Sequence, residues 1–316
     1  MKPMLLYGSE IWGLKEYKST EKVYTFALKK LLNVSPRTPN DIVYGETGRF
    51  PLHVLSCTSC IRYWLRLTTM DTPRLPRKAN NMLLSVLNCG QFCWASRMHQ
   101  VLYKFGFGFV WENQGVQNPK AFIKIFMQRL FNCHSQNWQE HVSNSTRFSI
   151  YRMFKTSISW EPYFTSVTNK HIRDILIKFR IGASNIRVHK MRYLAHTPQY
   201  LLCPLCNTAY EDEMHILFYC KSLDNLRQKY IPRKYVVRPS FVTLRLLMQD
   251  ESCLHDLGRF IYHSAERRDQ GSCPQQTFFL TLMFNPLVVI PYRVCNLHRA
   301  LFCFIGMLTR QQSSWI

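Results

Sequence analysis

The sequence predicts a mainly α protein that ends in a small, zinc-stabilised module with a Cys-Cys-His-Cys ligand set. Apolar residues recur at helical spacing in several segments, and prolines and glycines separate these segments. Cysteines and a histidine at metal-ligand spacing follow the clearest of them. The 316 residues, 47% of them hydrophobic, are enough to bury a core and to form two or three compact units.

The first region, residues 1–70, is expected to hold two helices. Over residues 21–34 one apolar stripe is expected to face the core, although Lys30 falls on the same side; the stripe comprises Val23, Phe26, Ala27, Leu31 and Val34. Two prolines within residues 35–41 end this helix. Residues 52–67 are rich in aliphatic side chains and predict the second helix.

A helical connector is predicted over residues 71–164. It begins with a basic loop, residues 72–80, that is a plausible boundary. Several aromatic-rich helices are expected over 82–160, with interruptions near residues 106–108 and 115–119, where glycine and proline occur.

The clearest amphipathic helix covers residues 169–180 and opens a predicted module over 165–232. Its apolar stripe follows the i, i+3, i+4, i+7 pattern, and Gly182 is expected to end it. Seven cations and one acid give residues 169–193 a net charge of +6. Because phosphate contacts need only positive charge within reach, these cations are the candidate nucleic-acid-binding residues: Lys170, Arg173, Lys178, Arg180, Arg187, Lys190 and Arg192. A solvated helix face is the alternative.

Further helices are expected over 223–230 and 242–268, with residues 233–269 forming a C-terminal helical region. Residues 270–316 contain no acidic residue and stay unassigned, as a disordered or read-through tail. The apolar run 277–292 is interrupted by Pro286 and Pro291, which makes it a poor membrane-spanning helix.

One segment has the spacing of a metal site, C-x2-C-x8-H-x4-C. Its candidate ligands are Cys203, Cys206, His215 and Cys220. Three thiolates and an imidazole form a closed tetrahedral set of the kind that zinc prefers, so the sequence predicts one structural Zn²⁺ ion. Four unrelated buried residues are the alternative.

The spacing also constrains the backbone. Residues five apart lie about 140° apart around an ideal helix, so the turn between His215 and Cys220 must loosen or end. Asp212 is expected to cap this helix, and Glu211 and Glu213 suit a helix start.

Other cysteines could form a second site, from Cys57, Cys60, Cys89 and Cys93. Buried thiols on helices are the favoured interpretation, because little around these residues resembles a knuckle.

Net charge indicates the partner, and the lack of an evident signal peptide indicates the compartment. With 41 Lys and Arg against 19 Asp and Glu, the chain carries +22, which favours RNA or DNA over the rival partner, an anionic membrane surface. No signal peptide is evident, so the twelve cysteines are expected to be reduced and the protein to be intracellular, in the nucleus, the cytoplasm or both.

Signatures of catalysis are absent from the sequence. It has no phosphate-binding loop, no G-x-S-x-G and no H-E-x-x-H. Two-metal polymerase chemistry needs clustered carboxylates, and none of the eight aspartates is adjacent to another. The chain is therefore not expected to be an enzyme.

Several segments together resemble LINE-type non-LTR retrotransposon polyproteins. They are LLYGSEIWG, TPNDIVYGETGRFPL, YWLRL, FGFGFVWENQ, KFRIGASNIRVHKMRY and CPLCNTAYEDEMHILFYC, and the resemblance covers roughly residues 5–269. It implies the end of a reverse transcriptase, its thumb and the zinc-binding segment that follows. The family's ligands correspond to the four residues given above. The sequence departs from the family's pattern at Ser184, His189, Met191 and Leu202, and none of these positions is a candidate zinc ligand.

The resemblance implies a fragment that lies downstream of the catalytic aspartates. The expected function is the binding of element RNA or target DNA without catalysis, with the remaining polymerase domains as further partners. A protein-interaction role, or a non-functional remnant with a purely structural zinc, is the alternative. Membrane association through residues 277–308 is a third possibility.

Overall fold

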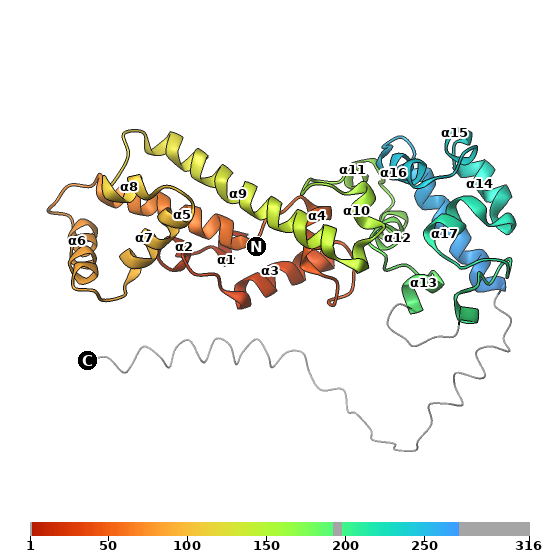
Figure 1. Ribbon diagram of the computed structural model, residues 1–316, viewed down its shortest axis with the longest axis horizontal. Coiled ribbons are helices and arrows are strands. Elements are labelled where there is room, and N and C mark those ends of the chain that lie inside the picture. The colour runs from red at the N-terminus through yellow and green to blue at the C-terminus, as the bar shows by residue number, and fades with distance from the viewer. Residues whose placement is uncertain (1, 192–197, 272–316) are drawn as a thin grey trace, which may run out of the picture. The chain divides into compact units, whose positions relative to one another are not determined.

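Helices make up the regular structure of this protein. The computed structural model describes residues 2–191 and 198–271, and within these ranges it contains no strand, only two isolated antiparallel bridges, Thr47 with Trp160 and Leu202 with Tyr210. The mainly α prediction is confirmed (Figure 1).

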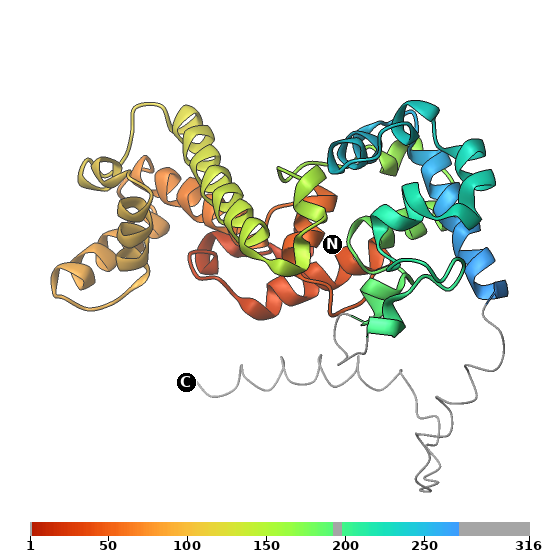
Figure 2. The ribbon, with the colours of Figure 1, turned by 45° about the vertical axis from the view of Figure 1, so that its right-hand side comes forward.

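Residues 2–144 contain nine α-helices. They are α1 (Lys2–Leu5), α2 (Ser9–Trp12), α3 (Lys18–Leu31), α4 (Asn40–Thr47), α5 (Leu52–Thr68), α6 (Leu75–Asn88), α7 (Trp94–Lys104), α8 (Gly108–Glu112) and α9 (Pro119–Asn144). The longest, α9, runs alongside α5 (Figures 1 and 2).

Shorter elements follow up to residue 236. They are η1 (Thr146–Phe148), α10 (Tyr151–Phe154), α11 (Tyr163–Ser166), α12 (Lys170–Arg180), α13 (Arg187–Lys190), η3 (Pro198–Leu201), η4 (His215–Tyr219), η5 (Lys221–Leu223), α14 (Asp224–Tyr230) and α15 (Arg233–Val236). The described residues end with α16 (Phe241–Gln249) and α17 (Leu254–Gly271).

Two apolar cores hold residues 2–271 together. One is built by α5, α7, α8 and the first half of α9, with fully buried Trp64 stacked on Trp111 at 5.6 Å between ring centroids. The other extends from Tyr24 to Ile261 and joins α3 and α4 to α12, α14 and α17. Elements on either side of the predicted boundaries at 164 and 232 thus share one core.

The helix that begins at Lys18 buries a different face from the one predicted. Tyr24, Leu28 and Leu32 pack in the core, whereas Val23, Phe26 and Leu31 are each more than half exposed. The predicted stripe was therefore wrong for these three residues, whereas Val34 packs against the core and Ala27 is partly buried. Apolar residues occupy more than one side of this helix, and burial of the Tyr24 side is what tertiary packing selects.

Four other predictions can be compared directly. The helices predicted over 52–67 and 169–180 are confirmed as α5 and α12, and Gly182 follows α12 with a φ of 67°. Residues 72–80 were expected to be a loop, but α6 begins at Leu75, with Pro76 in its first turn, where a missing N–H costs nothing. The single helix expected over 242–268 is instead two helices, α16 and α17. They are separated near Asp250, whose carboxylate accepts hydrogen bonds from the hydroxyls of Tyr235 and Ser252.

Gly48 ends α4 at a point where two chain segments touch. Its φ is 59°, and a Cβ atom there would lie 2.4 Å from the Trp160 backbone nitrogen. We expect Gly48→Ala to lower the free energy of unfolding by about 1–2 kcal/mol from left-handed strain plus about 1–3 kcal/mol from the clash.

Gly90→Ala is the matched control for that prediction. Its φ is 75°, but nothing lies within 4 Å of the added Cβ, so only the strain should be felt. Urea unfolding of both variants would measure the difference, and equal losses would show that the contact at Trp160 is unimportant.

Candidate metal centre

The first half of the metal centre is a tight turn between bridged residues. The Cys203 N–H donates to the Ala209 carbonyl at 2.8 Å, beside the bridge between Leu202 and Tyr210. Asn207, with a φ of 53°, turns the chain back and donates its N–H to the Cys203 carbonyl at 2.9 Å. This turn places both cysteine sulfurs on one side of the loop.

The second half is a wide helical turn that meets the geometric requirement set by the spacing. Residues His215–Tyr219 form a single π-type turn, in which the Cys220 N–H donates to the His215 carbonyl at 2.8 Å. Cys220 itself is extended, so the helix ends where the prediction required. Asp212 caps it, since its carboxylate accepts from the His215 N–H at 2.7 Å.

The four predicted ligands converge. Their ligand atoms all lie within 4.8 Å of one another; the Sγ atoms of Cys203 and Cys220 are 3.9 Å apart, and Cys206 Sγ is 3.3 Å from His215 Nε2. A tetrahedral ion with metal–sulfur bonds of about 2.3 Å separates two sulfurs by about 3.8 Å. Cys203, His215 and Cys220 are buried and Cys206 is partly exposed, so this cluster could hold a metal ion.

The surroundings of the cluster favour thiolate at Cys203 and thiol at Cys220. A hydrogen bond from the Cys220 thiol, aided by the backbone N–H groups of Leu205 and Cys206, lowers the pKa of Cys203 to about 4. The same hydrogen bond raises the pKa of Cys220, because that thiol is the donor. The proton held between the two sulfurs is the one that a metal ion would displace.

Among residues 2–191 and 198–271 no other group of metal-ligand side chains comes together in this way. Cys57 and Cys60 are buried on α5, and burial raises the pKa of each thiol to about 12. A thiol that holds its proton so firmly is a poor metal ligand.

Two carboxylates inside the ligand motif have a role that the sequence did not reveal. Glu211 is fully buried, pairs with Arg268 Nε at 2.5 Å, and accepts from the Arg187 backbone N–H at 2.6 Å. Glu213 Oε1 lies 2.7 Å from His189 Nε2. Both had been explained as suiting a helix start. Glu213 does open the helical turn after Asp212, but both carboxylates are also buried and bonded to distant partners. The feature of the sequence that could have indicated this role is the presence of two acidic residues inside the ligand motif of a strongly basic chain.

These carboxylates attach the basic turn α13 to the metal loop. Besides the Arg187 contact, the Val188 N–H donates to the Glu211 carbonyl at 3.3 Å. His189 is buried, and its second ring nitrogen lies 2.8 Å from the Ser184 hydroxyl. The turn α13 is therefore held through the backbone N–H groups of Arg187 and Val188 and through the His189 ring.

Most of the predicted nucleic-acid-binding residues that the structure describes lie at the surface. Lys170 and Lys190 are exposed, and Arg173, Lys178 and Arg187 are partly exposed. The Arg173 guanidinium also donates to the Val167 carbonyl at 3.1 Å. Arg192 lies outside the described residues.

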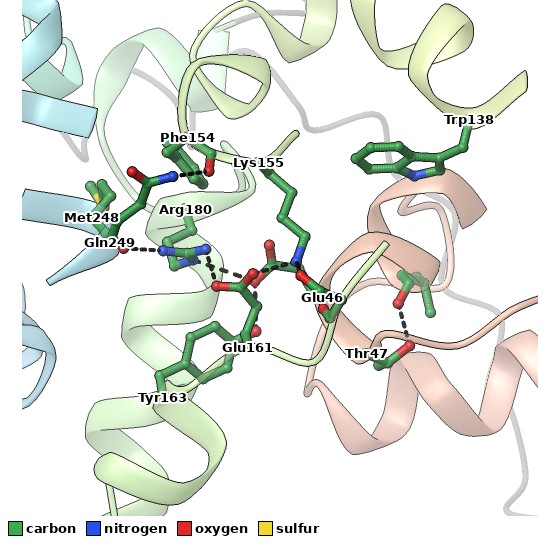
Figure 3. Close-up of polar contacts among 12 residues, drawn as sticks. Glu46, Thr47, Trp138, Phe154, Lys155, Glu161, Tyr163, Arg180, Met248 and Gln249 are labelled. Carbon is green, nitrogen blue, oxygen red and sulfur yellow. Dashed lines mark hydrogen bonds and ion pairs between the residues drawn. The ribbon is translucent and has the colours of Figure 1, made fainter. Parts of the chain in front are cut away.

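Arg180 is the exception, and its assignment to a nucleic-acid surface is corrected. Its side chain is buried and donates to the Met248 carbonyl at 2.8 Å and to Glu161 at 2.5 Å, with Glu46 at 3.4 Å (Figure 3). It also packs on the Phe154 ring at 4.6 Å. Burial alone would lower the pKa of Arg180, but the two carboxylates hold it above its usual value.

The rest of this buried cluster balances the charges. Lys155 pairs with Glu161 and donates to the Ser159 carbonyl at 2.8 Å, while the Tyr163 hydroxyl donates to Glu46 at 2.6 Å (Figure 3). Two cations thus face two carboxylates in the interior. The cluster is structural, since its hydrogen bonds join α12 to α16 and to the loop before α11, and join α11 to α4.

Comparison of the chain with protein-family models, with curated proteins and with solved structures finds no match. Within the described ranges, no helix is long and apolar enough to cross a membrane. The segment 277–308, considered for membrane association, lies outside these ranges, as do the unassigned residues 272–316.

Proposed function

We propose that this chain binds RNA or DNA through a basic surface that a structural zinc ion holds in place, and that it catalyses no reaction. One observation carries the proposal: the basic turn α13 is hydrogen-bonded to the loop that bears the metal ligands, through Glu211 and Glu213. The resemblance to the C-terminal part of LINE-type polyproteins supports the same function, with element RNA or target DNA as the ligand and the remaining polymerase domains as partners.

Zinc is the ion that suits this centre best. Three sulfurs and one imidazole nitrogen within 4.8 Å of one another form a soft, tetrahedral donor set. Four protein ligands leave no open coordination position, so the ion would stabilise the fold and supply no catalysis. Thr208 supports this set, since its hydroxyl donates to Cys206 Sγ at 3.1 Å.

The surface charge suits a polyanion. Five of the predicted cations remain at least partly exposed along residues 170–190 after Arg180 is removed from the set. The only acid in this stretch, Asp174, is buried and accepts from Asn33 Nδ2 at 2.8 Å. No carboxylate on this stretch therefore competes at the surface for the same cations.

Salt-dependent binding tests the proposal. Because each neutralised phosphate releases counterions, affinity for a single-stranded RNA or a DNA duplex should fall steeply as salt rises. We expect the triple variant Lys170→Gln, Arg187→Gln, Lys190→Gln to reduce the slope of log affinity against log salt concentration by about two to three units. Fluorescence anisotropy would measure the affinities.

A second triple variant provides the control. Lys15, Lys18 and Lys22 are exposed at the start of α3 or just before it, and their replacement by Gln removes the same charge. Only the first variant should change the slope. Equal effects of both would show diffuse attraction, and the basic surface beside the metal centre would have no special role.

A protein-interaction role is the second candidate, and the exposed apolar residues of α3 favour it. Val23, Phe26 and Leu31 are 52%, 51% and 57% exposed, as at surfaces that pack on another protein. Binding through these residues would be nearly independent of salt, which separates the two candidates in the same titration.

A further inference from the structure

A cavity of about 630 Å³ lies beside the metal centre. It is lined by the loop after α3, by α12 and by α17, and also by Ile216, which follows the ligand His215 directly. Its volume is in the range of about 300–1,000 Å³ that is typical of sites for small molecules.

The floor of the cavity is apolar. Ile175, Ile186, Ile216 and Ile261 contribute to it, and the last three are buried. Branched aliphatic side chains offer a dry surface for a flat ring, because burying that ring removes apolar area from water.

Charge at the cavity has one sign. None of its lining residues is Asp or Glu, whereas Lys178 is a partly exposed cation and Arg268 is a cation paired with Glu211. Asp174, the other carboxylate bonded to a lining residue, accepts from Asn33. An anionic group is therefore the complementary partner.

Hydrogen-bonding groups complete the lining. Asn33, Ser184, Asn185 and Ser264 belong to the lining. Three of them already bond within the protein, since Asn33 Nδ2 donates to Asp174, the Ser184 hydroxyl bonds His189 and the Ser264 hydroxyl donates to the Ile261 carbonyl, so the Asn185 amide and Asn33 Oδ1 are the groups offered to a ligand. Amides donate and accept at once, as the polar edges of nucleobases do. A free phosphate would leave the apolar floor unused, and a fatty acid would leave the amides unused.

We propose that this cavity binds one nucleoside monophosphate unit, the terminal nucleotide of a bound strand. The base lies on the isoleucine floor against the amides, and the phosphate meets Lys178, which is partly exposed. This inference rests on the proposed nucleic-acid-binding function and gives it a defined site for a strand end.

Titration of the full chain with AMP, CMP, GMP and UMP tests the inference, with hexanoate as an apolar anion that carries no base. We expect saturable binding of at least one nucleotide with a Kd of about 1 mM or tighter. Ala265 lines the cavity, so Ala265→Phe should fill it and weaken that binding at least about tenfold. Ala79→Phe, at an exposed position on α6, should leave it unchanged.

A second variant keeps the test independent of folding. Lys178→Gln should weaken nucleotide binding about tenfold and leave the weaker binding of the matching nucleoside unchanged, since only the phosphate contact is lost. Absence of nucleotide binding, equal affinity for hexanoate, or wild-type affinity in Ala265→Phe would each overturn the inference. If strands bind but mononucleotides do not, the cavity proposal alone fails. If mononucleotides bind and no strand does, the proposed function fails instead.

Discussion

Replacing Arg180 by methionine is expected to lower the free energy of unfolding by about 3–5 kcal/mol. Glu46 and Glu161 both pair with its guanidinium, and all three side chains are buried. Methionine fills similar space but leaves two carboxylates without that cation, and burying an uncompensated charge is costly. Urea unfolding followed by circular dichroism would measure the loss.

Two further variants identify the cause of that loss. Arg245→Met, at an exposed position on α16, should change stability by less than about 0.5 kcal/mol. Adding Glu46→Gln to Arg180→Met should recover part of the loss, because one unpaired charge is removed. A loss below about 1 kcal/mol for Arg180→Met would contradict the arrangement in Figure 3.

The other prediction with a large expected effect concerns the metal content of the chain. Chain purified under reducing conditions should contain about one zinc ion, and Cys206→Ser should lose most of it, together with several kcal/mol of stability. The reason is that the ligands come from two different turns, residues 203–209 and the π-type turn with the Cys220 that follows it, which the ion would cross-link. Elemental analysis and thermal unfolding with and without a chelator would measure both changes.

Cys89→Ser is the control, because Cys89 is an exposed thiol outside the cluster. It should keep the metal and the stability of the parent chain. Chelation should also speed amide hydrogen exchange over residues 187–190, since Glu211 and Glu213 hold them to the metal loop. Purified chain without bound metal would refute the assignment.

The metal ligands could be predicted because their signal is local. Cys203, Cys206, His215 and Cys220 lie within 18 consecutive residues, and the five-residue interval alone required the helix to loosen or end before Cys220. The helices α5 and α12 were predictable for a similar reason, since the residues whose pattern indicates each helix are consecutive in the sequence.

Arg180 could not be placed correctly from local sequence. A helical wheel assigns any cation opposite an apolar stripe to solvent, yet Arg180 is neutralised by Glu46, which lies 134 residues earlier. The burial of the Tyr24 side of α3 depends equally on distant partners, because the core that covers it extends to Ile261. Periodicity shows that a helix forms, but partners far along the chain decide which side is covered.

The separation of Glu46 from Arg180 has a consequence during synthesis on the ribosome. At about 5–20 residues per second, the 134 residues between them take about 7–27 s to translate. Throughout this interval α4 carries a carboxylate whose cation has not yet been made. The N-terminal helices must therefore stay hydrated or be shielded by a chaperone until α12 emerges, and the time of nascent-chain exposure is set by the length of chain between the two charges.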